Sequence, residues 1–507
     1  MKLCNLLHVL KEADIRGNRD VEITKICCDS RQVEKGSLFV CILGNREDGH
    51  AYAKEAVEAG AVALVLEKDS GVRKQDKEKE LQEAKEALLN EGGAVLEVPC
   101  TRQALACLSA AFFGHPARFL TTIGITGTKG KTTTAYLIRF MLEQAGLRVG
   151  LIGTIETIIG TEHIPAENTT PESCLLQESL FRMVEAGMDA VVMEVSSQGL
   201  KLDRTAGFVF DYGIFTNLGE DHIGPGEHRD LEEYMECKSR LFRQCRIGIV
   251  NCDDAHWQKI VQGHTCLLTT YGFSEKAQYR ALDTCLLRQE GKLAVQFKVH
   301  MPDGAKEGLF ETATPGRFSV YNSLAAIALC KHFGVETGLL RKTLQNARVK
   351  GRMEPVETQG GYTLLIDYAH NAMSLESLLE TLREYQPKRL LCLFGCGGNR
   401  SVLRRIEMGE VSGRLADFSI LTSDNPRFEE PLAILRDIRE GILPTGGSFV
   451  EIEDRREAIA YAMQLAEPGD ILVLAGKGHE TYQEIKGKKY PMDERELVRQ
   501  NLRKEGT

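Results

Sequence analysis

The sequence predicts an α/β protein of about three domains with a mostly parallel central sheet, and three observations lead to this prediction. The chain has 507 residues, which is too long for one hydrophobic core. Apolar, strand-like runs alternate with helical segments, an order that builds parallel sheets covered by helices. A glycine-rich turn stands between an apolar run and an amphipathic helix, which is the order that a phosphate-binding loop requires.

Composition excludes several classes of protein. The hydrophobic content of 43% and the charged content of 27% are typical of a globular protein, and no apolar run is long enough for a membrane span. The amino terminus becomes charged too early for a secretory signal, so we expect a cytoplasmic protein without membrane insertion. The net charge of −9 argues against a nucleic-acid partner. Fifteen scattered cysteines without a CxxC pair indicate reduced thiols.

Residues 1–98 are predicted to form a first, small α/β domain with strands at 37–43, 61–66 and 94–98. The segment 68–93 is rich in Lys and Glu. Because Leu81, Ala84 and Leu88 share one helical face, we interpret it as a surface helix and assign it no function.

Residues 99–346 are predicted to form the central domain. Apolar runs at 119–126, 190–195, 212–217 and 247–251 follow one another across helical segments, which predicts a mostly parallel sheet. The segment 346–351 (NARVKG) is the candidate hinge, and a third α/β domain covers 347–507.

In the third domain, four apolar runs each end at a polar or glycine-rich cluster. The runs are 364–366, 390–394, 418–421 and 471–474. Any one cluster could be an ordinary loop. Because ligands bind beyond the carboxyl ends of parallel strands, the four together predict one site.

The glycine-rich turn at 127–134 (GTKGKTTT) predicts nucleotide binding. Glycines let backbone N–H groups point inward, Lys131 adds a positive charge, and the Thr132 hydroxyl can bind Mg²⁺. The spacing is irregular, because five residues separate Gly124 from the Gly130-Lys131 pair and only two separate Gly127 from it, whereas the usual motif has four intervening residues. An ordinary β-to-α turn with a solvated lysine is the alternative.

Three further residues could take part in chemistry. Glu194 lies in a strand otherwise suited to burial, so a metal ion or cation is expected beside it, with a structural ion pair as the alternative. His222 could be a metal ligand or a hydrogen-bonded structural histidine. Lys238 lies on a helical face with Tyr234, Leu241 and Phe242, where a lysine can extend its ammonium group toward solvent.

In their order along the chain, these pieces resemble the Mur ligases over nearly the whole length. The matching pieces are Asp29-Ser30-Arg31, Asp48-Gly49-His50, Gly127 to Thr133, Asn168-Thr169-Thr170, Glu194 to Ser197, Asp221-His222, Asp367-Tyr368-Ala369-His370, Asp424-Asn425-Pro426-Arg427 and Gly476 to Glu480. The short phosphate loop is the form that this family uses. The resemblance implies three domains, with a central phosphate-loop domain and a Rossmann-like carboxyl-terminal domain.

The implied activity is an ATP- and Mg²⁺-dependent ligase of peptidoglycan synthesis. It would add meso-2,6-diaminopimelate to the D-glutamate carboxylate of UDP-N-acetylmuramoyl-L-alanyl-D-glutamate through an acyl phosphate. We expect a monomer. The alternatives are the same chemistry with L-lysine or another amine, including a folate-polyglutamate type of reaction, and a nucleotide-binding scaffold without catalysis.

The resemblance also implies roles for individual residues. The catalytic residues would be Lys131, Glu194, His222 and Lys238, the last as an N-carboxylated lysine. The residues implied for ATP are Gly127, Thr128, Lys129, Gly130, Lys131, Thr132, Thr133, Asn322, Arg352 and Asp367. The implied metal ligands are Thr132, Glu194, His222 and Lys238. Those implied for the UDP-linked substrate are Ser30, Asn45, Arg46, Glu47, Asn168, Thr169, Thr170, Ser196 and Arg204. Those implied for the amine are Arg400, Asp424, Asn425, Pro426, Arg427, Gly476 and Glu480.

The choice of diaminopimelate depends on Arg427. A guanidinium can bind the distal carboxylate of diaminopimelate in bidentate fashion, and L-lysine has no such carboxylate. The chain departs from the common family pattern at Gln198, Leu202 and 224–228, which puts details of the sugar-peptide pocket in doubt.

Overall fold

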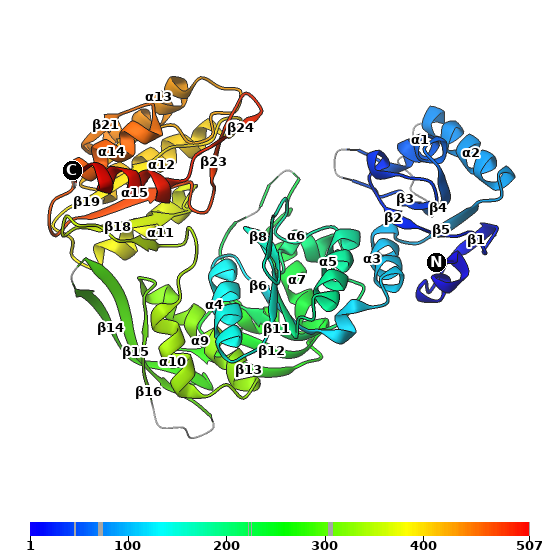
Figure 1. Ribbon diagram of the computed structural model, residues 1–507, viewed down its shortest axis with the longest axis horizontal. Coiled ribbons are helices and arrows are strands. Elements are labelled where there is room, and N and C mark those ends of the chain that lie inside the picture. The colour runs from blue at the N-terminus through cyan, green and yellow to red at the C-terminus, as the bar shows by residue number, and fades with distance from the viewer. Residues whose placement is uncertain are drawn as a thin grey trace. The chain divides into compact units, whose positions relative to one another are not determined.

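The computed structural model describes residues 1–44, 47–68, 75–221, 223–224, 226–289, 291–302 and 308–505 (Figure 1). The chain divides into two compact units, Met1–Tyr271 and Gly272–Thr507. No helix in the described ranges is both long and apolar enough to cross a membrane. The fifteen cysteines are thiols, and most of them are buried.

Unit 1 begins with a five-stranded sheet in the order β1-β5-β4-β3-β2, in which only β1 is antiparallel to its neighbour. Its strands are β1 (Asp14–Gly17), β2 (Lys25–Cys27), β3 (Ser37–Val40), β4 (Ala61–Glu67) and β5 (Ala94–Val98). Its helices are η1 (Leu3–Asn5), η2 (Leu7–Val9), η3 (Ser30–Gln32), η4 (Gly49–Tyr52), α1 (Ala53–Glu58) and α2 (Gln75–Asn90). The predicted strand at 37–43 ends early, because the Ile42 carbonyl accepts the Gly49 N–H across a turn.

Alternate strand residues of this sheet enter two separate cores. Leu38 and Val65 join residues of α3 (Thr101–Phe112), whereas Phe39 and Leu64 join residues of α1 and α2. Figure 1 shows α1 and α2 on the opposite side of the sheet from α3. Leu81, Ala84 and Leu88 of α2 are all buried, which confirms the predicted apolar face.

The second sheet of unit 1 has the order β13-β12-β11-β6-β10-β7-β8-β9. Neighbours from β13 to β7 are parallel, as predicted, and β8 and β9 add an antiparallel edge. Its strands are β6 (Thr121–Thr126), β7 (Val149–Ile152), β8 (Glu156–Ile159), β9 (Glu162–Pro165), β10 (Ala190–Glu194), β11 (Phe210–Phe215), β12 (Cys245–Asn251) and β13 (Leu267–Gly272). Its helices are η5 (Pro116–Phe119), α4 (Lys131–Gln144), α5 (Ser173–Glu185), α6 (Ser197–Lys201), α7 (Leu231–Arg243) and α8 (Trp257–Ile260). Apolar residues of α5 and α7 share one core with the strands, and α4 packs against β7 and β10.

Unit 2 opens with antiparallel strands and two helices. These elements are β14 (Tyr279–Gln289), β15 (Lys292–His300), β16 (Gly308–Thr312), α9 (Arg317–His332) and α10 (Thr337–Asn346). The three antiparallel strands were not predicted. The helix α10 ends where the candidate hinge begins.

The second part of unit 2 is a six-stranded sheet in the order β17-β18-β22-β19-β20-β21. Its strands are β17 (Glu354–Val356), β18 (Thr363–Asp367), β19 (Leu390–Phe394), β20 (Phe418–Leu421), β21 (Phe449–Glu451) and β22 (Ile471–Ala475), and a hairpin follows with β23 (Tyr482–Ile485) and β24 (Lys488–Pro491). The helices are α11 (Ala372–Arg383), α12 (Val402–Leu415), α13 (Pro431–Ile442), η6 (Leu443–Thr445), α14 (Arg455–Leu465) and α15 (Glu494–Glu505).

The four predicted runs of the third domain are β18, β22, β19 and β20, which are adjacent and parallel. Their polar ends therefore meet at one edge of the sheet, as the sequence predicts. Both faces are covered, because α11, α12 and α13 pack on one apolar cluster and α14 and α15 on the other.

Candidate functional site

The phosphate loop connects the carboxyl end of β6 to the amino terminus of α4. Gly130 has a φ of 85°, in the left-handed region, and immediately precedes the helix. No side chain of the described residues caps this helix end, as is typical of a helix amino terminus that binds phosphate. The backbone thus has the form that the sequence predicts.

Gly127 is required by its neighbour on the next strand. A Cβ built on Gly127 would collide with the Thr216 Oγ1, so the Thr216 side chain packs directly against the backbone of the loop. Thr216 in turn donates a hydrogen bond to the Lys129 carbonyl at 2.8 Å. The Lys131 ammonium lies over the loop and donates to the carbonyls of Gly127 at 2.8 Å and Thr128 at 3.1 Å.

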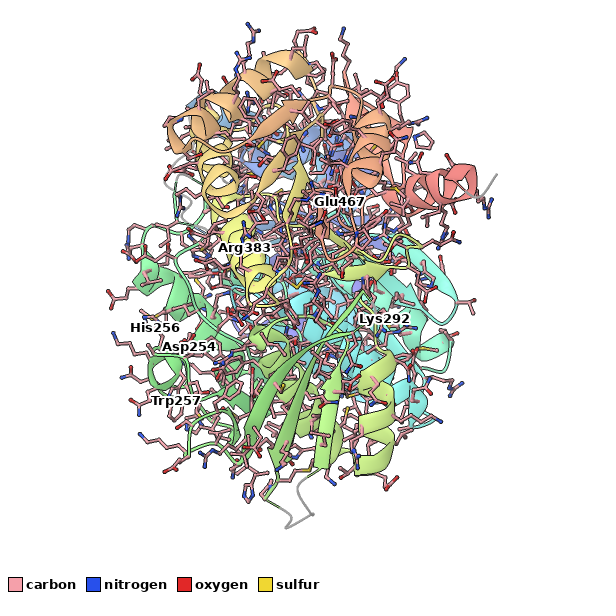
Figure 2. The ribbon with its side chains drawn as sticks, turned by 90° about the vertical axis from the view of Figure 1, so that its left-hand side faces the viewer. Asp254, His256, Trp257, Lys292, Arg383 and Glu467 are labelled. Carbon is pink, nitrogen blue, oxygen red and sulfur yellow. The ribbon has the colours of Figure 1, made fainter. Side chains whose placement is uncertain are left out.

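Asn217 holds the loop from the side. Its Oδ1 accepts the Lys129 N–H at 2.9 Å, and its Nδ2 donates to the Lys129 carbonyl at 3.0 Å. The loop that carries Asn217 is itself fixed by Asp254, which lies beside His256 and Trp257 (Figure 2) and accepts the Leu218 N–H at 2.7 Å. The sequence marks this strand end as polar, but nothing in it singles out Asn217.

Glu194 ends β10 and is 1% exposed. Its carboxylate accepts hydrogen bonds from the Thr132 hydroxyl at 2.9 Å, the Thr154 N–H at 2.9 Å and the Thr154 hydroxyl at 3.0 Å. No ion pair recorded for the described residues involves Glu194. Among the described residues, neutral donors therefore compensate the buried charge.

The structure brings together two of the predicted Mg²⁺ ligands. The Thr132 hydroxyl and the Glu194 carboxylate are in direct contact, and both are hard oxygen donors of the kind that Mg²⁺ prefers. His222, the third, lies outside the described residues. Within the described ranges no group of three His, Cys, Asp or Glu side chains could hold a metal ion, so this donor pair alone supports the fit to Mg²⁺.

Lys238 reaches the same loop from α7. The helical face that it shares with Tyr234, Leu241 and Phe242 is buried, as predicted. Its side chain is 1% exposed, so the interpretation that its ammonium extends to solvent is wrong. Its Nζ donates to the Gly127 carbonyl at 2.9 Å and lies 4.3 Å from the Tyr234 ring centroid. Burial, and then the charge of Lys131, hold the pKa of Lys238 well below its usual range.

The residues expected at the sugar-peptide form a connected group beside Glu194. Thr170 donates to the Glu194 carbonyl at 2.9 Å and accepts the Ser196 N–H at 2.9 Å. Arg204 donates to the Thr170 carbonyl at 2.8 Å and pairs with Glu172 at 2.5 Å. Thr169 contacts Thr154 at 3.0 Å, and Asn168 is exposed.

The expected uridine-binding residues are only partly described. Ser30 begins η3, and Glu47 accepts the Tyr52 hydroxyl at 2.6 Å. Asn45 and Arg46 lie outside the described residues. No hydrogen bond between the described residues joins Ser30 to Glu47.

In unit 2, a buried lysine connects three of the expected amine-binding residues. Lys477, which is 0% exposed, donates to the Asn425 Oδ1 at 2.8 Å and to the Glu480 Oε2 at 2.7 Å, and it lies 3.8 Å from the Asp424 carboxylate. Asn425 also donates to Glu480 at 2.9 Å. Lys477 belongs to the glycine-rich cluster at 476–480, but the sequence alone does not indicate that it organises the site.

Arg427 is held in place on two sides. Its φ of 53° is unusual for a residue with a side chain. Its Nε donates to the Glu484 Oε2 at 3.0 Å and its Nη1 to the Gly398 carbonyl at 2.8 Å. A clamp on a substrate carboxylate would therefore use its remaining N–H groups. Pro426 lies close to Gly398, because a Cβ built on Gly398 would collide with the Pro426 carbonyl. Arg400 is exposed.

The three residues expected at the adenine and ribose all belong to unit 2. Asp367 accepts the N–H groups of Met353 at 2.7 Å and Ala369 at 2.8 Å, and burial raises its pKa. The Arg352 guanidinium lies 4.8 Å from the Tyr368 ring centroid. Asn322 is buried in α9. The structure therefore places Arg352 and Asp367 near one another, at the end of β18.

Comparisons with known proteins match the chain almost throughout. Residues 22–113 match the family model of the Mur ligase family catalytic domain, 125–330 that of the Mur ligase middle domain, and 351–478 that of the Mur ligase glutamate ligase domain. The UDP-N-acetylmuramoyl-L-alanyl-D-glutamate–2,6-diaminopimelate ligase of Caldanaerobacter subterraneus is 42% identical, with 99% of each chain covered.

Two solved structures are also similar. The structure of a UDP-N-acetylmuramoyl-L-alanyl-D-glutamate–2,6-diaminopimelate ligase is 27% identical, with a TM-score of 0.68 and coverage of 100% of this chain and 99% of that one. The MurF ligase of Thermotoga maritima in complex with ADP is 19% identical, with a TM-score of 0.58 and coverage of 96% and 98%. The second likeness concerns the fold alone.

Proposed function

The chain belongs to the Mur ligase family, and we propose that it adds meso-2,6-diaminopimelate to the D-glutamate carboxylate of UDP-N-acetylmuramoyl-L-alanyl-D-glutamate in peptidoglycan synthesis. The enzyme is an ATP-dependent, ADP-forming amide ligase. The observation that carries the proposal is the convergence of Lys131, Lys238 and the Thr132–Glu194 pair on one phosphate loop. A simple nucleotide-binding turn needs neither the buried carboxylate nor the second lysine.

The first half of the reaction transfers a phosphoryl group to the substrate carboxylate. The carboxylate oxygen bonds to the transferred phosphorus while the bond to the leaving ADP oxygen breaks, giving an acyl phosphate. The loop N–H groups orient the phosphates, and Lys131 leaves the loop carbonyls to contact the transferred group. A bound Mg²⁺, held by Thr132, Glu194 and His222, would neutralise charge on the phosphates.

Lys238 is assigned as an N-carboxylated lysine. A neutral amine takes up CO₂ and loses a proton, which gives an anionic carbamate suited to Mg²⁺. Its burial and its depressed pKa favour the neutral amine that this step requires. The change places an anion beside the cation of Lys131.

The second half joins the amine to the acyl group. The neutral amine nitrogen attacks the acyl carbon, the bond between that carbon and the phosphate oxygen breaks, and the nitrogen loses a proton, so that an amide and free phosphate remain. We assign the amine to the strand ends of unit 2, where Asp424 and Glu480 can accept from its ammonium groups and Arg427 and Arg400 can bind its carboxylates. The residues that complete this assignment are Asn425, Pro426 and Gly476.

The other substrates are assigned by the same family resemblance. The adenosine end is assigned to Asn322, Arg352 and Asp367. The sugar-peptide is assigned to Asn168, Thr169, Thr170, Ser196 and Arg204, and the uridine diphosphate to Ser30, Asn45, Arg46 and Glu47. We also propose domains at 1–98, 99–346 and 347–507, a monomeric enzyme and a cytoplasmic location, where ATP and UDP-linked precursors are available.

Phosphate release measured with the UDP-muramoyl dipeptide and each candidate amine tests the proposal. We expect kcat/KM for meso-diaminopimelate to exceed that for L-lysine by roughly a hundredfold or more, because L-lysine leaves the carboxylate-binding groups unpaired. Equal values, or a preference for L-lysine, would overturn the assignment of the amine. No phosphate release with any amine would overturn the activity itself.

A further inference from the structure

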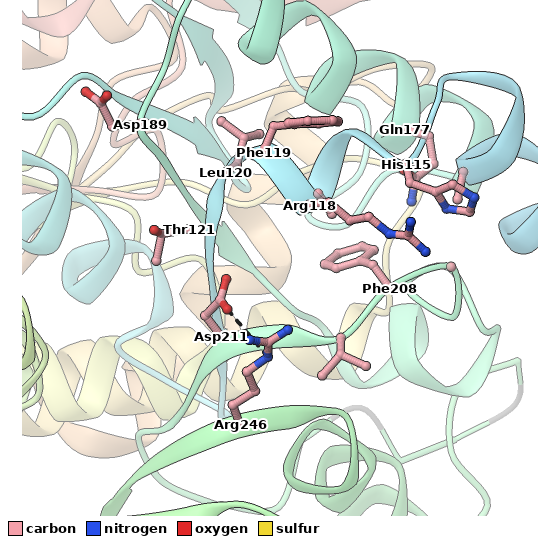
Figure 3. Close-up of a pocket in the computed structure, with 14 residues that line it drawn as sticks. His115, Arg118, Phe119, Leu120, Thr121, Gln177, Asp189, Phe208, Asp211 and Arg246 are labelled. Carbon is pink, nitrogen blue, oxygen red and sulfur yellow. Dashed lines mark ion pairs between the residues drawn. The ribbon is translucent and has the colours of Figure 1, made fainter.

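In unit 2, Arg455 and Glu494 form an ion pair that is shielded from water. Arg455 begins α14 and Glu494 begins α15, and both side chains are 0% exposed. Other ion pairs of the described residues lie nearer the surface. The Asp211–Arg246 pair, which lines the pocket in Figure 3, has an Arg246 side chain that is 73% exposed. Because moving two charges out of water costs free energy, the attraction within the buried pair does not by itself explain it.

The Arg455 guanidinium connects two strand ends of the amine site. Its Nη1 donates to the Ser423 carbonyl at 3.4 Å, and its Nη2 donates to the Ala475 carbonyl at 2.9 Å. Ser423 directly precedes Asp424, and Ala475 directly precedes Gly476. Each carbonyl therefore belongs to the peptide group that leads into a residue assigned to the amine.

The sheet itself does not pair these two strand ends with each other. The strand β19 lies between β20 and β22, and its pairing with β20 ends at Leu421. Its pairing with β22 ends at Leu474. Beyond these residues, Lys477 joins side chains of the site, whereas Arg455 joins the backbones that carry them.

The two strand ends are too close together for their distance to vary freely. Gly476 has a φ of 105°, in the left-handed region, and a Cβ built on it would lie 2.9 Å from the Asp424 Oδ2. The Asp424 carboxylate also lies 3.8 Å from the Lys477 ammonium. A shift of either strand end would therefore move a carboxylate that is assigned to an ammonium group of the substrate.

Glu494 fixes the direction of the Arg455 guanidinium. Its Oε1 accepts the Arg455 Nε–H at 2.8 Å and lies 2.8 Å from Nη2. The remaining N–H groups of Nη1 and Nη2 then point to the two carbonyls. A planar guanidinium presents its donors in fixed directions, whereas a lysine ammonium is a single point charge. Arginine is therefore suited to this connection and lysine is not.

We infer that Arg455 is a positioning residue for the amine substrate. It fixes the distance between the strand ends that carry Asp424 and Gly476, and Glu494 holds it in the direction that this requires. This role rests on the proposed addition of diaminopimelate. Because Arg455 is buried, it acts through the backbone of its neighbours and does not contact the substrate.

Arg455→Lys keeps the buried positive charge but loses the planar set of donors. We expect KM for diaminopimelate to rise roughly tenfold, because Asp424 and Gly476 lose their fixed spacing. The KM for ATP should stay within about twofold of the parent value, since the residues assigned to ATP do not contact Arg455. Initial rates with each substrate varied in turn measure both constants.

Arg455→Met combined with Glu494→Gln removes both charges and keeps the approximate volume of each side chain. The pair is removed as a whole, because loss of Arg455 alone would leave a buried carboxylate unpaired. The same selective rise in KM for diaminopimelate is expected. The matched control is Arg389→Met combined with Asp470→Asn. It removes another pair with a buried carboxylate, at the opposite end of β22, and should change neither constant.

Hydrogen exchange followed by mass spectrometry measures the positioning without the reaction. The segments 422–427 and 475–480 should exchange roughly tenfold faster in both Arg455 variants than in the parent protein, because their backbone loses a shared donor. The control pair of substitutions should leave exchange in both segments at the parent rate.

Unchanged exchange in these two segments would overturn the role of Arg455, as would an unchanged KM for diaminopimelate. Equal rises in both Michaelis constants, or a control that behaves like the Arg455 variants, would also overturn it, because the effect would then be general damage to unit 2. If the parent protein released no phosphate with diaminopimelate, the proposed function would fail. The exchange rates would still decide whether Arg455 holds the two strand ends.

Discussion

At the scale of single residues, one carbonyl oxygen organises the phosphate site. The Gly127 carbonyl accepts hydrogen bonds from both Lys131 and Lys238. Two ammonium groups on one acceptor repel each other, and the repulsion adds to burial in depressing the pKa of Lys238. A change that removes the charge of Lys238 relieves both effects.

Lys238→Arg and Lys238→Ala should both reduce phosphate release to roughly a hundredth or less, because neither side chain can form the carbamate ligand. ¹³C NMR after addition of labelled bicarbonate should show a carbamate signal in the parent protein that is lost in both variants. Full activity of Lys238→Arg would contradict the carbamate, because it would mean that a positive charge at this position is sufficient for catalysis. Lys54→Ala, at an exposed lysine of unit 1, is the control.

Glu194→Gln keeps the shape of the side chain and an acceptor for Thr154 but removes the charge. If Glu194 is a metal ligand, the Mg²⁺ concentration for half-maximal activity should rise at least about tenfold, because the loss of a residue that only supports a metal ligand already weakens metal binding by this factor. Activity is measured across a Mg²⁺ titration. The control Glu143→Gln, which alters a pair with Arg139 on α4, should leave the titration unchanged. An unchanged titration in Glu194→Gln would make this carboxylate structural.

Arg427→Ala should raise KM for diaminopimelate roughly ten- to hundredfold, because charge-assisted hydrogen bonds to the substrate carboxylate are lost. The KM for ATP should change little. Initial rates with each substrate varied in turn give both constants. Because Arg427 also pairs with Glu484, Glu484→Gln is measured alongside it. Equal changes in both constants for Arg427→Ala would identify Arg427 as a structural residue, and Arg439→Ala is the control for a surface arginine of unit 2.

At the scale of elements, the phosphate loop is positioned by the strand beside it. The segment after β11 contacts it through Thr216 and Asn217, and Asp254 before α8 fixes that segment in turn. The geometry of the phosphate loop therefore depends on the segments that follow β6, β11 and β12. These three strands are neighbours in the sheet.

Asn217→Ala removes both side-chain hydrogen bonds to Lys129, so the loop should lose part of its fixed geometry. We expect KM for ATP to rise about tenfold, while KM for the UDP-muramoyl dipeptide stays near its parent value. Steady-state kinetics measure both constants. Asn501→Ala on α15 also removes an asparagine hydrogen bond and should change neither constant. Parallel increases in both constants for Asn217→Ala would indicate general damage to unit 1.

At the scale of the whole molecule, the two units carry different parts of the proposed reaction. The loop, Glu194 and Lys238 belong to unit 1, and the Lys477 cluster and Arg427 belong to unit 2. Activation of the carboxylate and choice of the amine should therefore be separable by substitution.

Trapping with hydroxylamine in the absence of diaminopimelate tests this separation, because hydroxylamine converts an acyl phosphate to a stable hydroxamate. Arg427→Ala should form hydroxamate at close to the parent rate. Lys131→Ala should form less than about a hundredth of it, since it lacks the cation that contacts the transferred phosphoryl group. Loss of hydroxamate in both variants would show that the two functions are not divided in this way.

The sequence predicts those parts of the fold that depend on local pattern. Strands such as β18 and β22 are continuous apolar runs, because parallel strands are buried on both faces, and their polar ends could therefore be assigned to one edge. The antiparallel strands β14 and β15 were missed. The local signal was present, because apolar and polar residues alternate along β15 and only two residues, the second of them Gly291, separate the strands in the sequence. Only the register of the strands depends on contacts between them.

Pairings between distant residues could not be predicted. Asn217, Lys477 and Glu484 are ordinary polar residues in the sequence, and they acquire roles only when folding brings them to Lys129, Asn425 and Arg427. The residues at the phosphate loop were found because their spacing along the chain is itself part of their chemistry.

The close approach of Gly127 to Thr216 has a consequence for drug resistance. Bacteria escape many inhibitors by replacing a side chain that the compound contacts. At position 127 any replacement would collide with Thr216 and displace the end of β11. A compound that recognised only the backbone of residues 127–130 would leave the bacterium few single substitutions that block the drug and spare the enzyme.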